Sequence, residues 1–220
     1  MDLNIQQILV GFLAITISLT VHEFAHAFVA DRLGDPTPGE NGRLTLNPMV
    51  LWTNYPIGAL VAPLLGAATG FLMGWAATPV SPHRVRRGIS IRKADLLISA
   101  AGPLSNVLLA LVSIALVATT YRWTGPGTDT LVTPLGELFW FMVQANVLLA
   151  VFNMLPVPPL DGFHVLSSLA PRSWEAALGF LQQFGMLILL VIIMRGGVLF
   201  GPVFRVAAEV TRWAVILVNG

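Results

Sequence analysis

The chain has 220 residues, of which 55% are hydrophobic and only 10% charged, whereas an ordinary soluble domain has about 25% charged residues. A mean hydropathy of +0.78 and several apolar stretches of bilayer-spanning length indicate an integral membrane protein. The formal net charge of +1 predicts no nucleic-acid partner, and the absence of cysteine excludes disulfides and thiolate metal ligands.

The first apolar segment, residues 5–30, contains His22, Glu23 and His26 in the pattern H-E-x-x-H. Side chains four residues apart share a helix face, so the two histidines can bind one metal ion together. Glu23 stands beside the first of them and can take a proton from a water molecule at the site. Ionisable groups are costly inside hydrocarbon, which favours a functional site over a satisfied polar cluster between helices.

A polar stretch rich in glycine and proline follows at residues 31–55. Within it, residues 42–47 alternate weakly between polar and apolar side chains, which predicts a short β-strand. An exposed strand edge can pair with an extended peptide, and we therefore hypothesise that residues 43–47 offer an edge to an unwound substrate. Residues 56–77 are apolar but broken by one proline and several glycines, which favours a re-entrant hairpin over a full crossing.

A basic loop follows the broken segment and predicts the orientation of the chain. Such loops remain on the cytoplasmic side of membranes, and the N-terminus has no lysine or arginine. Residues 5–30 therefore run inward, and residues 56–77 begin and end on the cytoplasmic side. The basic residues of the loop are Arg84, Arg86, Arg87, Arg92 and Lys93.

Four further apolar segments complete the chain, at residues 94–120, 134–155, 176–194 and 198–218. The predicted fold is an all-α polytopic membrane protein with five to six membrane segments, including the possible hairpin and the short β element. We expect one domain over residues 1–220, with a core at about 5–165 and accessory helices at about 172–220. No cleavable signal peptide is expected, because the N-terminus lacks a basic region.

A catalytic zinc ion usually takes three protein ligands, so His22 and His26 need a third. Asp161 is the predicted one, because it follows a proline-rich break at the inner end of the segment 134–155. Its alternative is an ordinary Asp-Gly turn. Asn153 could stabilise an oxyanion or bind the substrate backbone, or simply bond to a neighbouring helix. His164 could be a rival ligand, an outer partner or, more simply, an interface histidine.

Four motifs in this order resemble the site-2 protease family of intramembrane zinc metalloproteases, peptidase family M50. They are His22–His26, the run GRLTLNP at 42–48, the run AGPLSN at 101–106, and residues 152–162, which read FNMLPVPPLDG. Ser105 and Asn106 of the third motif can also be read as polar contacts between helices. Residues 49–55 lack a His and an Asp that relatives often carry, and Ala77 replaces a usual lysine.

The resemblance implies one Zn²⁺ per chain, held by His22, His26 and Asp161, with Glu23 as general base and Asn153 at the oxyanion or substrate. It implies hydrolysis within transmembrane segments of other membrane proteins, by a compact bacterial-type member without a PDZ or CBS domain. We expect a bacterial plasma membrane and an active site toward the cytoplasm. The rivals are a metal-ion transporter and a non-catalytic protein that binds membrane helices. The sequence does not indicate an oligomeric state.

Overall fold

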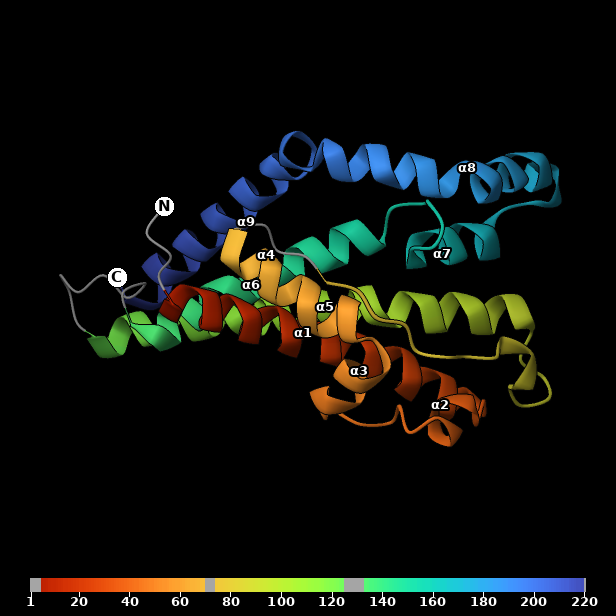
Figure 1. Cartoon of the computed structure of the whole chain (residues 1–220), viewed down its shortest axis with the longest axis horizontal. Coiled ribbons are helices and arrows are strands. Elements are labelled where there is room, and N and C mark those ends of the chain that lie inside the picture. Colours follow the sequence, from red (N-terminus) through yellow and green to blue (C-terminus); the bar gives the residue numbers. More distant parts are fainter. Residues whose placement is uncertain (1–4, 70–73, 125–132, 220) are drawn as a thin grey trace.

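The computed structural model describes residues 5–69, 74–124 and 133–219, and the protein is a bundle of helices (Figure 1). The long helices are α1 (Ile5–Leu33), α5 (Ile91–Thr124), α6 (Pro134–Asn153), α8 (Glu175–Met194) and α9 (Gly196–Asn219). The shorter helices are α2 (Thr37–Glu40), α3 (Pro48–Asn54), the π-helix η1 (Pro56–Val61), α4 (Ala62–Thr69) and α7 (Asp161–Leu169). Two 3₁₀ turns, η2 (Pro82–Arg84) and η4 (Arg172–Trp174), complete the elements.

Helices α1, α5 and α6 pack against one another and form the centre of the bundle (Figure 1). Ile15 of α1 meets Ala145 and Leu149 of α6 in one buried cluster. Ala30 of α1 meets Ala94 and Ile98 of α5 in another. Small side chains at these contacts let helix backbones approach closely, which is the usual way in which membrane helices associate.

The described residues include four helices that are long and apolar enough to cross a membrane: Ile5–Leu33, Ile91–Thr120, Pro134–Asn153 and Arg172–Met194. The apolar helix at Pro56–Ala68 is shorter. At about 1.5 Å per residue its length is roughly 20 Å, below the ~30 Å hydrocarbon core. The chain after this helix runs back beside it, since Trp75 N donates to Gly58 O at 2.9 Å. Trp75 is therefore close to Gly58, as a hairpin at residues 56–77 requires, while residues 70–73 lie outside the described part of the chain.

The predicted β element at residues 42–47 is wrong, because no described residue there belongs to a strand. Hydrogen bonds between side chains and nearby main-chain atoms are formed here in place of hydrogen bonds to a neighbouring strand. Asn47 N donates to Thr45 Oγ1, and the Asn47 side chain then caps α3 by accepting from Met49 N. A weak alternation over six residues does not form a strand without a neighbouring strand to supply hydrogen bonds. The hypothesis of an exposed strand edge for the substrate falls with it.

Asp35, a fully buried carboxylate, joins the end of α1 to the segment that precedes η2. It accepts hydrogen bonds from Thr37 N at 3.0 Å, from Thr37 Oγ1 at 2.6 Å and from Ser81 N at 2.5 Å. Arg84 adds a surface contact, since its guanidinium lies 2.7 Å from Glu40 Oε2. This hydrogen-bonded contact lowers the pKa of the Glu40 carboxyl below its usual value. Residues 78–81 are thereby held against α1.

Helix α7 is fixed to the start of α5 by side chains from both helices. The Arg92 guanidinium donates to the main-chain oxygen atoms of Ser167 and Ala170. Ser168 Oγ donates to Asp95 Oδ2 at 3.1 Å. On its other side, the proline-rich break before α7 packs under α8, where Leu189 contacts Val157 and Leu160. These contacts fix the first residue of α7, which is Asp161.

Candidate metal centre

Three ligand atoms from two distant parts of the chain meet in the centre of the bundle. Nε2 of His22 lies 3.1 Å from Nε2 of His26, both on α1. Asp161 Oδ2, at the start of α7, lies 3.2 Å from the first nitrogen and 3.3 Å from the second. Both histidines are buried. The group of three predicted from the sequence is thus brought together, and it could hold a metal ion.

The other ring nitrogen of each histidine determines what Nε2 can do. His22 Nδ1 lies 2.6 Å from Asn106 Oδ1, and His26 Nδ1 lies 2.7 Å from the main-chain oxygen of Ile98. Both partners are acceptors, so each Nδ1 carries the proton and donates it. In a neutral imidazole the other nitrogen then presents a lone pair, which is the form that binds metals.

The orientation of the Asn106 amide is set by a buried chain of hydrogen bonds between α1, α5 and α6. Asn106 Nδ2 donates to Asn146 Oδ1 at 2.7 Å, so its Oδ1 is turned to His22. Asn146 Nδ2 in turn donates to Ser18 Oγ at 2.8 Å, and Ser18 Oγ donates to Ala14 O. In this series of hydrogen bonds each side chain donates to the next one, from His22 to Asn106, Asn146 and Ser18. This order requires the proton of His22 to be on Nδ1.

The geometry fits a cation. Two lone-pair nitrogens and a carboxylate oxygen face one another, and Asp161 Oδ2 is buried without a hydrogen-bond partner among the described residues. Such a cluster of acceptors repels itself unless a positive charge lies between them. A tetrahedral zinc ion with bonds of about 2.0–2.1 Å separates its ligand atoms by roughly 3.3 Å. The observed separations of 3.1, 3.2 and 3.3 Å therefore match a zinc site.

Two glycines allow close packing at this group and beside it. A Cβ atom at Gly102 of α5 would lie 2.4 Å from His26 Nε2 and 2.6 Å from His22 Cε1. A Cβ atom at Gly162 would lie 2.3 Å from the main-chain oxygen of Met154. The Asp-Gly pair is therefore no surface turn, because its glycine packs the start of α7 against the end of α6.

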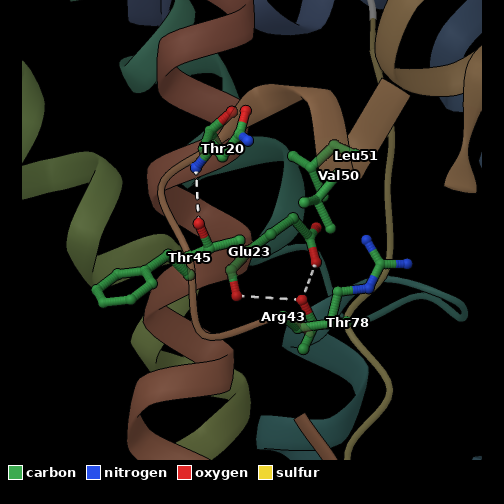
Figure 2. A pocket seen from close by; sticks show the side chains of 9 residues that line it. Thr20, Glu23, Arg43, Thr45, Val50, Leu51 and Thr78 are labelled. Carbon is green, nitrogen blue, oxygen red and sulfur yellow. Dashed lines mark hydrogen bonds between the residues drawn. The ribbon is translucent and has the colours of Figure 1, made fainter. Parts of the chain in front are cut away.

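Glu23 is buried and faces a small pocket beside the metal-ligand helix (Figure 2). Thr78 Oγ1 lies 2.7 Å from Glu23 Oε2 and 3.1 Å from the Glu23 main-chain oxygen. The hydroxyl holds the carboxylate in one orientation while leaving its other oxygen available. The pocket is lined by Thr20, Glu23, Phe24, Arg43, Thr45, Asn47, Val50, Leu51 and Thr78.

Two other predicted residues lie outside the group of three ligands. Asn153 is half-buried, and its Nδ2 donates to Leu149 O on its own helix at 3.0 Å. The exposed His164 pairs instead with Asp95, with 3.5 Å between Nδ1 and Oδ2. Its role as a rival ligand is not supported among the described residues, since the candidate group is His22, His26 and Asp161 alone.

Asn146, Gly102 and Thr78 are the residues that sequence reasoning missed. An asparagine in the middle of an apolar segment was a usable signal for Asn146, because an amide in hydrocarbon requires a partner. Gly102 lies in a motif that the family resemblance includes, but its contact with the histidines depends on how α5 crosses α1. Thr78 carries no local signal, since its role depends on the fold of residues 74–81 against α1.

Comparison with known proteins agrees with this geometry. The model of "Peptidase family M50" matches residues 128–194. The chain is 35% identical over 186 residues to "Putative zinc metalloprotease YwhC" of Bacillus subtilis, covering 84% of this chain and 80% of that protein. It is 30% identical over 195 residues to "Putative zinc metalloprotease Rip2" of Mycobacterium tuberculosis, covering 86% of this chain and 69% of that protein.

No solved structure matches the chain with statistical significance. The similarity to YwhC extends over most of both chains. In the described structure the histidines of the first motif and Asp161 of the last motif lie in one group of candidate ligand atoms. The chain therefore belongs to peptidase family M50, the zinc metalloprotease family that its sequence motifs resemble.

Proposed function

We propose that this protein hydrolyses peptide bonds within or near the transmembrane segments of other membrane proteins. The observation that carries the proposal is the triangle of His22 Nε2, His26 Nε2 and Asp161 Oδ2, with Glu23 one residue from the first ligand. A carboxylate adjacent to the first histidine of H-E-x-x-H is the general base of metalloproteases. The two histidines lie on a helix that is long and apolar enough to cross a membrane, which favours a membrane-embedded substrate.

His22, His26 and Asp161 would hold the zinc ion. When bound, zinc lowers the pKa of water and polarises a peptide carbonyl. Glu23 takes a proton from the attacking water and returns it to the leaving amine. Thr78 orients the Glu23 carboxylate for both transfers through the bond to Oε2. Asn153 is a predicted donor to the oxyanion or to the substrate backbone, and it would exchange its bond to Leu149 O for that contact.

The site is proposed to lie inside a bacterial plasma membrane and toward the cytoplasm. His22 is nearer to Leu33 than to Ile5, the two ends of α1. The basic loop lies at the Leu33 end, since Arg86 N donates to Leu33 O at 2.9 Å. Loops with excess positive charge stay in the cytoplasm, so that end of α1 would be cytoplasmic.

We also propose that residues 56–77 form a re-entrant hairpin. Together with the four candidate spanning helices it would make five membrane segments, and α9 would make a sixth. Residues 5–165 would form the catalytic core, since they hold every proposed site residue. Residues 172–220 would be accessory helices. Helix α8 supports the core indirectly, because it packs on the proline-rich break that precedes Asp161.

The test is to incubate purified protein with a panel of peptides that contain membrane segments. We expect cleavage of at least one peptide, its loss on treatment with a zinc chelator, and its return when zinc is added. Helix-breaking residues in the substrate should favour cleavage, because peptide bonds in a helix are shielded and hydrogen-bonded. Chelator-resistant cleavage would overturn the proposal, as would the absence of cleavage across the panel.

Neither rival accounts for Glu23 as well as the protease does. A transporter needs ligands for a moving ion but no general base beside them. A non-catalytic protein that binds membrane helices needs no triangle of metal-ligand atoms. Transport of zinc into vesicles without peptide cleavage would favour the first rival, and binding of membrane helices without either activity would favour the second.

A further inference from the structure

Arg43, in the segment between α2 and α3, is a buried cation without an ion-pair partner among the described residues. Only 7% of the residue is exposed, and its Nη1 atom is buried without a hydrogen-bond partner. The aromatic ring of Tyr55 lies 5.2 Å from the guanidinium carbon and supports one face of the group. That contact does not use the N–H donors of Nη1, because cation–π attraction acts through the face of the group.

An unused donor of this kind is costly. A buried donor without an acceptor loses about 1–3 kcal/mol of hydration free energy, and more when the group is charged. The fold nevertheless holds Arg43 in place, since its main-chain N donates to Pro38 O at 2.8 Å. A buried donor without a partner is available to an acceptor that arrives from outside the chain.

The place where such an acceptor would arrive is the pocket of Glu23. Arg43, Glu23 and Thr78 line the same pocket (Figure 2). The floor and walls also include the apolar side chains of Phe24, Val50 and Leu51. The pocket thus combines the proposed general base, one free cationic donor and an apolar wall.

The acceptor is a peptide carbonyl rather than a carboxylate, for two reasons of chemistry. A carboxylate in the pocket would face the negative charge of Glu23. Membrane segments contain few carboxylates, because each is costly in hydrocarbon, whereas every residue brings a carbonyl. When a helix is unwound for cleavage, its carbonyl oxygens lose their partners and need donors from the enzyme.

We propose that Arg43 donates through Nη1–H to a main-chain carbonyl oxygen of the unwound substrate, next to the bond that Glu23 serves. This inference rests on the proposed function and adds to it a substrate-binding residue. It explains why the guanidinium is buried without an internal partner. It also assigns a task to the segment 43–47 that does not depend on a β-strand.

The first test compares Arg43→Met with the wild-type protein on a membrane-segment peptide that the wild type cleaves. The value of kcat/KM should fall roughly 10- to 100-fold, the effect of losing one hydrogen bond from a charged donor. Zinc content should stay at the wild-type level, because Arg43 is not one of the proposed ligands. Arg87→Met is the matched control, since Arg87 is exposed and should tolerate the same change.

The second test distinguishes contact with the substrate from a structural effect. Peptides are made in which one carbonyl oxygen at a time, on either side of the cleaved bond, is replaced by sulfur, a weaker acceptor. One position should slow the wild-type protein several-fold and leave the Arg43→Met protein unaffected. If Arg43→Met does not fold, Arg43→Lys replaces it in this test. The rate reduction caused by sulfur at that one carbonyl should then differ between Arg43→Lys and the wild type, whereas the reductions at the other carbonyls should be the same in both proteins.

Several results would overturn the inference. Equal kcat/KM values for wild type and Arg43→Met would do so, as would identical sulfur-replacement profiles. Dependence of the Arg43 effect on an acidic side chain in the peptide would show that the acceptor is a carboxylate. Absence of any cleavage by the wild type is a different outcome, because it removes the proposed function on which the inference rests.

Discussion

Nδ1 of His22 lies 2.6 Å from Oδ1 of Asn106, so a contact between α1 and α5 sets the tautomer of a proposed metal ligand. The Asn106 amide is itself oriented by Asn146 on α6. Three helices of the central bundle therefore share in presenting one imidazole nitrogen. Outer partners of this kind orient a ligand and raise its basicity.

Replacing Asn106 with leucine should weaken zinc binding by about 10- to 100-fold, the usual effect of losing an outer partner. The leucine keeps the volume but removes the acceptor that holds the His22 Nδ1 proton. Zinc affinity can be measured by competition with a chelator. Ser105→Ala is the control, since Ser105 Oγ bonds only within its own helix, to Gly102 O at 2.7 Å. Equal affinities for the two variants would contradict the assignment.

Replacing Gly102 with alanine should weaken zinc binding about 5- to 150-fold, because overpacking a buried site costs roughly 1–3 kcal/mol. The new methyl group would lie 2.4 Å from His26 Nε2, so the ring would be displaced. The zinc content of the purified protein measures the effect. Gly179→Ala in α8 is the matched control, because no atom lies within 4 Å of its Cβ position. A fully loaded Gly102→Ala protein would contradict the described crossing of α5 over α1.

Asp161→Ala should leave the protein without tightly bound zinc, since two histidines alone make an incomplete site. The readout is zinc per chain after dialysis, by elemental analysis. Glu175→Ala removes an exposed carboxylate from the first turn of α8 and should retain one zinc ion per chain. Retention of zinc by Asp161→Ala would show that another residue completes the site.

Thr78→Val should lower kcat about 10- to 100-fold without loss of zinc, because a hydrogen bond to a charged group contributes about 1.5–3 kcal/mol. The valine keeps the shape of the side chain but leaves Glu23 Oε2 without its donor. Thr53→Val is the control, as the exposed Thr53 hydroxyl bonds only to main-chain atoms of α3. An unchanged kcat in Thr78→Val would remove the orienting role.

The sequence predicted the grouping of His22, His26 and Asp161 better than it predicted the residues that support this group. His22 and His26 share a helix face by periodicity alone, and the proline break before Asp161 indicated a carboxylate at membrane depth. The link from His22 through Asn106 to Asn146 joins residues that are far apart in the sequence. It depends on how three helices cross, which no local pattern encodes.

The error at residues 42–47 has a physical cause. Periodicity of two describes a strand only when a second strand supplies hydrogen bonds, and Thr45 and Asn47 satisfy their own segment instead. His164 follows Asp161 by three residues, but it points to Asp95 on α5. Proximity in sequence to a ligand did not imply a place in the metal-ligand group.

The most direct test of the account is the cleavage of a membrane-segment peptide by Glu23→Gln protein that holds one zinc ion per chain. Glutamine keeps the shape of Glu23 but cannot accept a proton from water. We predict that zinc content equals that of the wild type while kcat falls about 10²- to 10⁴-fold, the usual contribution of a general base. Cleavage by zinc-loaded Glu23→Gln at the wild-type rate would contradict the account.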